Sequence, residues 1–137
     1  MKPLLFIHPV GQACAFIFGL FNLLTGLTRR WFIIPLHINC GAIYYFVIFF
    51  GAVMGSLIAQ WARSQGLPIT MDAHKVTAML MLILIAAGAT TGVLLVRGST
   101  QRKRLVRYHR WINIITIVLF IAQALSGVIM LVHIFRL

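Results

Sequence analysis

Acidic residues are almost missing from this sequence. Its 137 residues include 12 lysines and arginines but only one acidic residue, Asp72. Charged residues of all kinds make up 9% of the chain, whereas soluble domains carry about 25%, so an ordinary soluble domain is excluded. The formal net charge of +11 does not indicate nucleic acid binding, because the basic residues are confined to short connections between apolar runs.

Cysteine is scarce as well. Cys14 and Cys40 fall early in the first and second apolar runs, so in antiparallel helices they lie near opposite membrane faces, too far apart for a disulfide. The sequence has no C-x-x-C-H motif, which excludes the usual covalent attachment of a c-type haem.

Apolar residues, by contrast, make up 61% of the chain. Four stretches contain no charged residue: 3–28, 31–62, 76–96 and 111–135. Each is long enough to cross the membrane, which takes about 20 helical residues. We therefore predict one all-α membrane domain over residues 1–137, with helices at about 5–28, 36–62, 71–96 and 106–135. The short connections favour an up-down-up-down four-helix bundle.

The first run is expected to be a membrane span and not a signal peptide, because only Lys2 precedes it and no small-residue cleavage site is evident. With alternating spans, one face gathers eight basic residues: Arg29, Arg30, Arg97, Arg102, Lys103, Arg104, Arg107 and Arg110. The other face gathers four: Lys2, Arg63, Lys75 and Arg136. The positive-inside rule predicts that both termini lie outside the cytoplasm. We expect a multi-pass protein of a bacterial inner (cytoplasmic) membrane.

Four histidines stand one per apolar run, each with a glycine 18 residues later. The pairs are His8 with Gly26, His37 with Gly55, His74 with Gly92 and His109 with Gly127. An α-helix turns about 100° per residue, so 18 residues bring the glycine back to the face of the histidine, roughly 27 Å further along the axis. At +14, near the same face, stand small or polar residues again: Asn22, Gly51, Gly88 and Gln123.

The histidines form two pairs by membrane side. His8 and His74 begin helices that start on the outer face, whereas His37 and His109 begin helices that start on the inner face. In a square bundle the helices of each pair are diagonal, so the two imidazoles can meet across the bundle axis. Two facing imidazoles suit a six-coordinate haem iron, and the pattern predicts an outer haem on His8 and His74 and an inner haem on His37 and His109.

The glycines fit the same interpretation. A flat ring held between two helices presses against the other two, and a residue without Cβ lets their backbones come close. Gly26 and Gly92 are expected to face the inner haem, and Gly55 and Gly127 the outer haem. The alternative is that these glycines only pack helices together, as small residues in membranes commonly do. Zinc is less favoured than haem iron, because two diagonal histidines do not complete a zinc site.

Basic residues near the histidines are candidate partners of haem carboxylates. On the inner side these are Arg30, Arg107 and Arg110, and on the outer side Lys75 and Arg136.

Two further polar residues each allow two interpretations. His133 is either an ordinary interfacial histidine or a group that binds quinone or guides a proton. Asp72 is either a favourable charge in the first turn of the third helix or a proton acceptor near His74.

The pattern is that of a known family. His8-Pro9 opens the first run, each of the four helices has one such histidine, and the last run carries Tyr108-His109-Arg110-Trp111-Ile112-Asn113 followed by Ala124-Leu125-Ser126-Gly127-Val128. In these features nearly the whole chain resembles the cytochrome b561 superfamily in its minimal four-helix bacterial form. The resemblance implies two b-type haems and electron transfer linked to quinone, superoxide or ascorbate. Because the ascorbate-linked members have six helices, no ascorbate site is carried over.

We therefore expect electron transfer across the membrane, between quinone and a periplasmic redox protein or a larger respiratory complex. Two alternatives remain: a superoxide:quinone oxidoreductase, and a haem-free scaffold or assembly subunit. The outer face is the less basic one, which disfavours the superoxide alternative. Whether the chain is an enzyme in its own right stays open.

Overall fold

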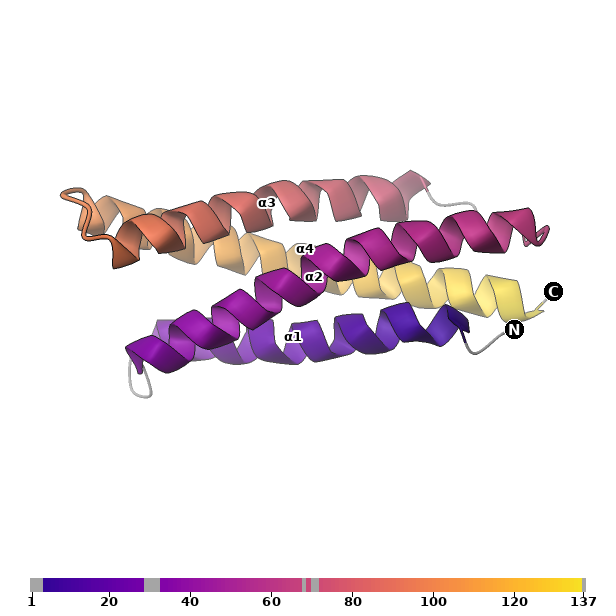
Figure 1. The fold of residues 1–137 in the computed structure, drawn as a ribbon, viewed down its shortest axis with the longest axis horizontal. Helices are drawn as coiled ribbons and strands as arrows, with labels where there is room; N and C mark the ends of the chain where they lie inside the picture. Colours follow the sequence, from indigo (N-terminus) through magenta and orange to yellow (C-terminus); the bar gives the residue numbers. More distant parts are fainter. Residues whose placement is uncertain (1–3, 29–32, 68, 70–71, 137) are drawn as a thin grey trace.

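The computed structural model describes residues 4–28, 33–67, 69 and 72–136. They form four helices: α1 (Leu4–Thr28), α2 (Ile34–Ser64), α3 (Asp72–Val96) and α4 (Arg102–Arg136). All four are long and apolar enough to cross a membrane, and they pack as one bundle in which α1 begins and α4 ends at the same end (Figure 1). The predicted all-α four-helix architecture is confirmed, and the chain is a multi-pass membrane protein with four candidate spans.

The bundle consists of two antiparallel hairpins. Helix α1 packs along α2, and α3 packs along α4, whereas the contacts of α1 with α4 and of α2 with α3 are fewer. Among the described residues, α1 and α3 make no close backbone contact, and neither do α2 and α4, so these are the diagonal pairs. We call α1/α2 the first hairpin and α3/α4 the second hairpin.

Helices α2 and α3 end in the same kind of glycine cap. Gly66 and Gly98 have φ angles of 76° and 81°, a left-handed conformation that is strained for residues with a Cβ. In each cap the glycine amide donates to the carbonyl three residues back, and the next amide donates to the carbonyl five residues back, at 3.0–3.4 Å. These bonds satisfy carbonyls that would otherwise lack a partner at the helix end.

Helix α4 begins four residues earlier than the sequence indicates, at Arg102 in place of residue 106. The Ser99 hydroxyl accepts the Gln101 amide at 3.2 Å, and the Gln101 carbonyl accepts the amides of Arg104 and Leu105, each at 3.0 Å. The apolar pattern does not reveal this start because the first turn is basic, although Arg and Lys are good helix formers.

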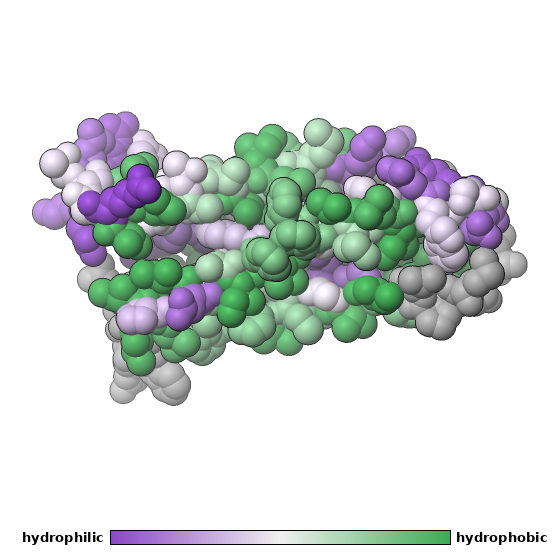
Figure 2. Space-filling view, in the orientation of Figure 1, coloured by the Kyte–Doolittle hydropathy of each residue, from purple (hydrophilic) through white to green (hydrophobic). Residues whose placement is uncertain are grey.

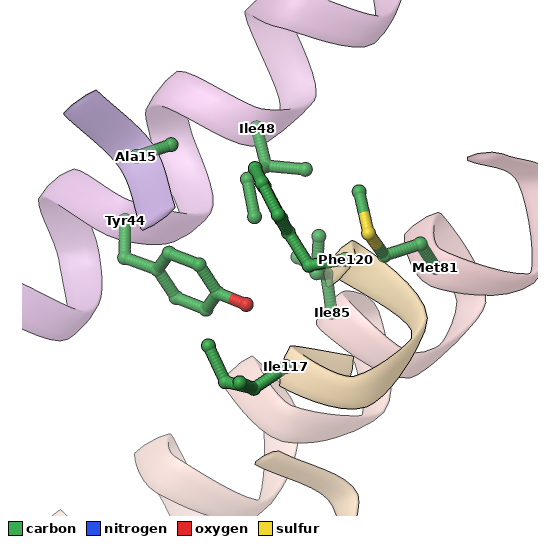
Figure 3. Packing of buried hydrophobic residues seen from close by; sticks show 7 residues of the cluster. All are labelled: Ala15, Tyr44, Ile48, Met81, Ile85, Ile117 and Phe120. Atoms are coloured by element: carbon green, nitrogen blue, oxygen red, sulfur yellow. The ribbon is translucent and has the colours of Figure 1, made fainter. Parts of the chain in front are cut away.

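A central apolar cluster lies between the two ends of the bundle, with side chains from all four helices (Figure 3). Its members are Ala15, Tyr44, Ile48, Met81, Ile85, Ile117 and Phe120. Ala15, Tyr44 and Met81 each follow the histidine of their own helix by seven residues, a rise of about 10 Å. The cluster therefore separates one pair of histidines from the other.

Hydrophobic side chains form most of the surface around the middle of the bundle, and hydrophilic ones gather towards its two ends (Figure 2). Large apolar residues are exposed along every helix, among them Ile17, Phe46, Ile83 and Ile129. In water such a surface would be unfavourable, but in a membrane it faces lipid. A smaller cluster of Leu5, Ala62 and Ile134 closes the end where α1 begins.

Candidate functional site

The four histidines lie in two layers. His37 and His109 have ring centres 6.3 Å apart, with the ring planes at 66°. His8 and His74 lie close enough at the other end to interact electrostatically. The structure thus brings together the same two diagonal pairs that the sequence predicts, and we call His8 and His74 the outer layer and His37 and His109 the inner layer.

Each histidine lies against a glycine of the antiparallel helix in its own hairpin. A Cβ placed on the glycine would approach Cε1 of the imidazole at 3.2 Å for Gly26 with His37, 2.8 Å for Gly55 with His8, 3.4 Å for Gly92 with His109 and 3.4 Å for Gly127 with His74. A side chain at Gly55 would force a shift, and one at Gly26 would be tight. The glycines therefore leave room for an imidazole, a role within the hairpin that the sequence does not reveal.

The backbone of the residue four positions before each of these glycines interacts electrostatically with the same imidazole. The pairs are Gly51 with His8, Asn22 with His37, Gln123 with His74 and Gly88 with His109. The +14 and +18 positions of one helix thus form a cradle for the histidine of its antiparallel neighbour. The cradle is reciprocal within each hairpin, so the chain contains it four times.

The hydrogen bonds of His109 define its tautomer. Its Nδ1 lies 3.1 Å from the Gly88 carbonyl oxygen and 3.1 Å from the Thr91 hydroxyl. A carbonyl can only accept, so Nδ1 carries the proton. The Thr91 hydroxyl donates its own proton to the carbonyls of Ala87 and Gly88. It therefore accepts the Nδ1 proton of His109. Nε2 keeps its lone pair, which the Asn113 amide nitrogen approaches at 3.4 Å.

The same reasoning assigns His74. Its Nδ1 lies 2.8 Å from the Ser126 hydroxyl, which donates its proton to the Gln123 carbonyl at 2.8 Å. Ser126 must then accept, so His74 Nδ1 is the donor and Nε2 is bare. A histidine that binds a metal through Nε2 commonly holds Nδ1–H in this way.

In the first hairpin, no such hydroxyl stands beside His8. Nδ1 of His8 is buried and makes no hydrogen bond of ordinary length and angle with the described residues, although it interacts electrostatically with the Gly51 backbone. The position that Ser126 and Thr91 occupy, one before the cradle glycine, is Met54 on α2. On α1 it is Thr25, which is buried and donates to the Asn22 carbonyl at 3.0 Å.

The geometry can be tested against a metal held between two imidazoles. If each imidazole places a nitrogen about 2 Å from one metal, the ring centres are about 6 Å apart, and the rings of the inner layer are 6.3 Å apart. No group of three His, Cys, Asp or Glu side chains within the described part of the chain could hold a metal ion. The donor set therefore fits a cofactor that needs two axial nitrogens, such as haem, better than a tetrahedral zinc.

The candidate carboxylate partners differ in position. Lys75 and Arg110 each follow a histidine by one residue, so they lie about 100° from it around the helix. Arg107 stands two residues before His109, about 160° away, where it lines a pocket at the surface. Arg30 lies outside the described residues.

The remaining polar candidates are exposed. His133 is exposed near the end of α4, and Asp72 stands exposed in the first turn of α3. Cys14 is exposed, Cys40 is buried, and both are free thiols. Sequence reasoning missed two residues, Thr91 and Ser126, whose hydroxyls bond to the histidines. Each stands 17 residues after the histidine of its own helix, directly before the glycine at 18 residues.

Comparison of the chain with protein families, with curated proteins and with solved structures finds no match. The fold alone defines the class: a multi-pass, all-α membrane protein built as a four-helix bundle. Any narrower assignment depends on the two histidine layers.

Proposed function

We propose that this protein carries electrons across the membrane through two b-type haems. His8 and His74 would hold the outer haem, and His37 and His109 the inner haem. The observation that carries the proposal is the inner layer, where two imidazoles from diagonal helices stand 6.3 Å apart and where His109 keeps the Nε2 lone pair that iron needs. The similarity to the cytochrome b561 superfamily in its histidine and glycine pattern supports the same function.

The side chains of the chain would do three things. The four imidazoles would bind iron through Nε2 while the cradles hold the Nδ1 edges. Lys75 and Arg110 would pair with haem carboxylates. The central cluster and the lipid-facing apolar residues would keep water away from the region between the layers. A bound haem would supply reversible one-electron oxidation and reduction.

The expected redox partners follow from the small part of the described chain that lies outside the four helices. The described residues are almost entirely helical, and no described segment forms a redox domain outside the membrane. We infer that electrons pass between membrane quinone and a periplasmic redox protein or a larger respiratory complex. With the predicted orientation, both termini are outside a bacterial inner membrane and the connection between α3 and α4 is in the cytoplasm.

Visible spectroscopy of the purified chain tests the proposal. We expect two haems per chain, and reduced-minus-oxidised bands of low-spin b-type haem. A colourless protein that stays folded after haem-supplemented expression would contradict it and favour the scaffold alternative. Rapid reduction of the haems by superoxide, with transfer to quinone, would favour the superoxide:quinone oxidoreductase.

A further inference from the structure

A cationic pocket lies near the beginning of α4, on the surface of the bundle. It is lined by Lys103, Val106, Arg107, Arg110 and Trp111, which we call the α4 pocket. Arg107 and Trp111 each stand two residues from His109, so they lie about 160° from it around the helix. Both are exposed. This part of the pocket therefore faces away from the histidine layers, whereas Arg110, about 100° from His109, is the pocket residue that is also proposed for a haem carboxylate.

No acidic side chain of the sequence stands near the α4 pocket. The one acidic residue of the chain, Asp72, stands in the first turn of α3. In the bundle, α3 begins at the end opposite to the beginning of α4 (Figure 1). Lys103 and Arg107 therefore have no acidic side chain of the chain near them and are available to an anionic group from outside it.

A neighbouring arginine is held differently. Arg104 Nε donates to the Tyr108 hydroxyl at 3.1 Å, and its guanidinium lies 5.5 Å from the centre of the Tyr108 ring. It thus has a partner on its own helix. Arg104 has the same charge and nearly the same depth as the pocket residues, which makes it a matched control.

Apolar residues continue from the pocket along the same face of α4. Trp111, Ile115 and Val118 follow at helical spacing and are 56%, 47% and 60% exposed. A ligand that fits both parts has an anionic head and an apolar chain. In a membrane, this chemistry belongs to an anionic phospholipid, and Trp commonly stands at the depth of the headgroups.

We propose that the α4 pocket binds the phosphate of an anionic phospholipid, with one acyl chain along Trp111, Ile115 and Val118. This goes beyond general contact with lipid because it assigns one site and one headgroup charge. The proposal does not depend on haem. It assigns Arg107 to lipid, in place of the haem carboxylate that the sequence suggests.

Native mass spectrometry of the full chain tests the proposal, with phosphatidylglycerol and phosphatidylcholine as probes. We expect a single tight phosphatidylglycerol adduct and no equivalent phosphatidylcholine adduct. The double variant Lys103→Gln/Arg107→Gln should bind phosphatidylglycerol about thirtyfold more weakly, because each direct bond to the phosphate that is lost contributes about fivefold. The control Arg102→Gln/Arg104→Gln removes the same charge and should weaken binding less than threefold.

Three results would overturn the proposal. Equal weakening in both double variants would indicate attraction to charge in general and no site. Displacement of the lipid by millimolar inorganic phosphate would indicate a site for small anions. Loss of haem with unchanged lipid binding in Lys103→Gln/Arg107→Gln would indicate that these cations serve a haem carboxylate.

Discussion

The two hairpins have the same histidine and glycine arrangement, but His8 of the first hairpin is held differently from the two histidines of the second hairpin. In the second hairpin, Ser126 and Thr91 accept the Nδ1 protons of His74 and His109 at 2.8 and 3.1 Å. In the first hairpin, His8 Nδ1 is buried without such a bond. The second hairpin thus presents two unprotonated Nε2 atoms, that of His109 approached by the Asn113 amide at 3.4 Å, and each proposed haem would receive one ligand from each hairpin.

The difference shows that the repeat has two levels. The cradle, made of a backbone contact at +14 and a glycine at +18, is present four times and provides space. The hydroxyl at +17 orients the ring and is replaced on α2 by Met54. Because oriented ligands bind a metal more firmly and are more basic, His8 is expected to contribute less to haem binding than His74 or His109.

The largest expected effect comes from filling a cradle. Gly26→Leu should remove the inner haem, since even a Cβ at this position would lie 3.2 Å from His37 Cε1, and should leave the outer haem bound. The measurement is haem content per chain together with the spectrum of the haem that remains. Gly11→Leu is the control, because a Cβ at Gly11 meets nothing within 4 Å. Loss of the outer haem in Gly26→Leu would contradict the assignment of layers.

A smaller substitution compares the hairpins directly. Gly55→Ala should destabilise the outer haem site more than Gly127→Ala, because the added Cβ would lie 2.8 Å from His8 Cε1 but 3.4 Å from His74 Cε1. Overpacking of this kind costs about 1–3 kcal/mol. Thermal release of haem from the two variants measures it. Equal midpoints would show that the cradle of the first hairpin relaxes freely.

Removing a hydroxyl should change a redox potential with little loss of haem. Ser126→Ala leaves His74 Nδ1 without its hydroxyl acceptor, so the ligand is less basic and the potential of the outer haem should rise. A hydrogen bond of about 1 kcal/mol corresponds to about 40 mV for a one-electron couple. Thr91→Ala should raise the inner potential less, because the Gly88 carbonyl also accepts from His109.

Serine and threonine residues that face away from the histidines provide controls for these potentials. Ser56 and Thr90 are exposed and donate only to carbonyls of their own helices, Ala52 and Ala86. Ser56→Ala and Thr90→Ala should leave both potentials unchanged in a redox titration. If Ser126→Ala also has no effect while both haems are bound, the hydroxyl does not tune its ligand.

The smallest expected effect comes from adding a hydrogen bond to His8. Met54→Thr introduces a hydroxyl at the position that Ser126 and Thr91 occupy in the second hairpin, and His8 Nδ1 could donate to it. The potential of the outer haem should then fall by a few tens of millivolts, opposite in sign to Ser126→Ala. Met54→Leu, which adds no acceptor, is the control in the same titration.

Much of the architecture could be predicted from the sequence because it depends on local properties. Charge-free runs of membrane length predict the four helices, and the 18-residue spacing places each histidine and glycine on one face. The start of α4 at Arg102 was missed, since a basic turn has no apolar pattern.

What each cradle touches depends on a neighbouring helix, so the sequence could not show it. Gly26 is on the face of His8 but packs against His37, and only the pairing of helices reveals this. The role of the Ser126 hydroxyl as an acceptor is likewise visible only once α4 is packed beside His74 of α3. The glycines lie at the predicted layers, and their approach to a haem ring stays a prediction.

The most direct test of the two layers is electron paramagnetic resonance of four single variants of the oxidised, haem-loaded chain. His8→Ala and His74→Ala should lose the same one of two low-spin haem signals, and His37→Ala and His109→Ala should lose the other, while His133→Ala should keep both. If His8→Ala and His74→Ala lost different signals, the diagonal pairs would not be the ligands of shared haems.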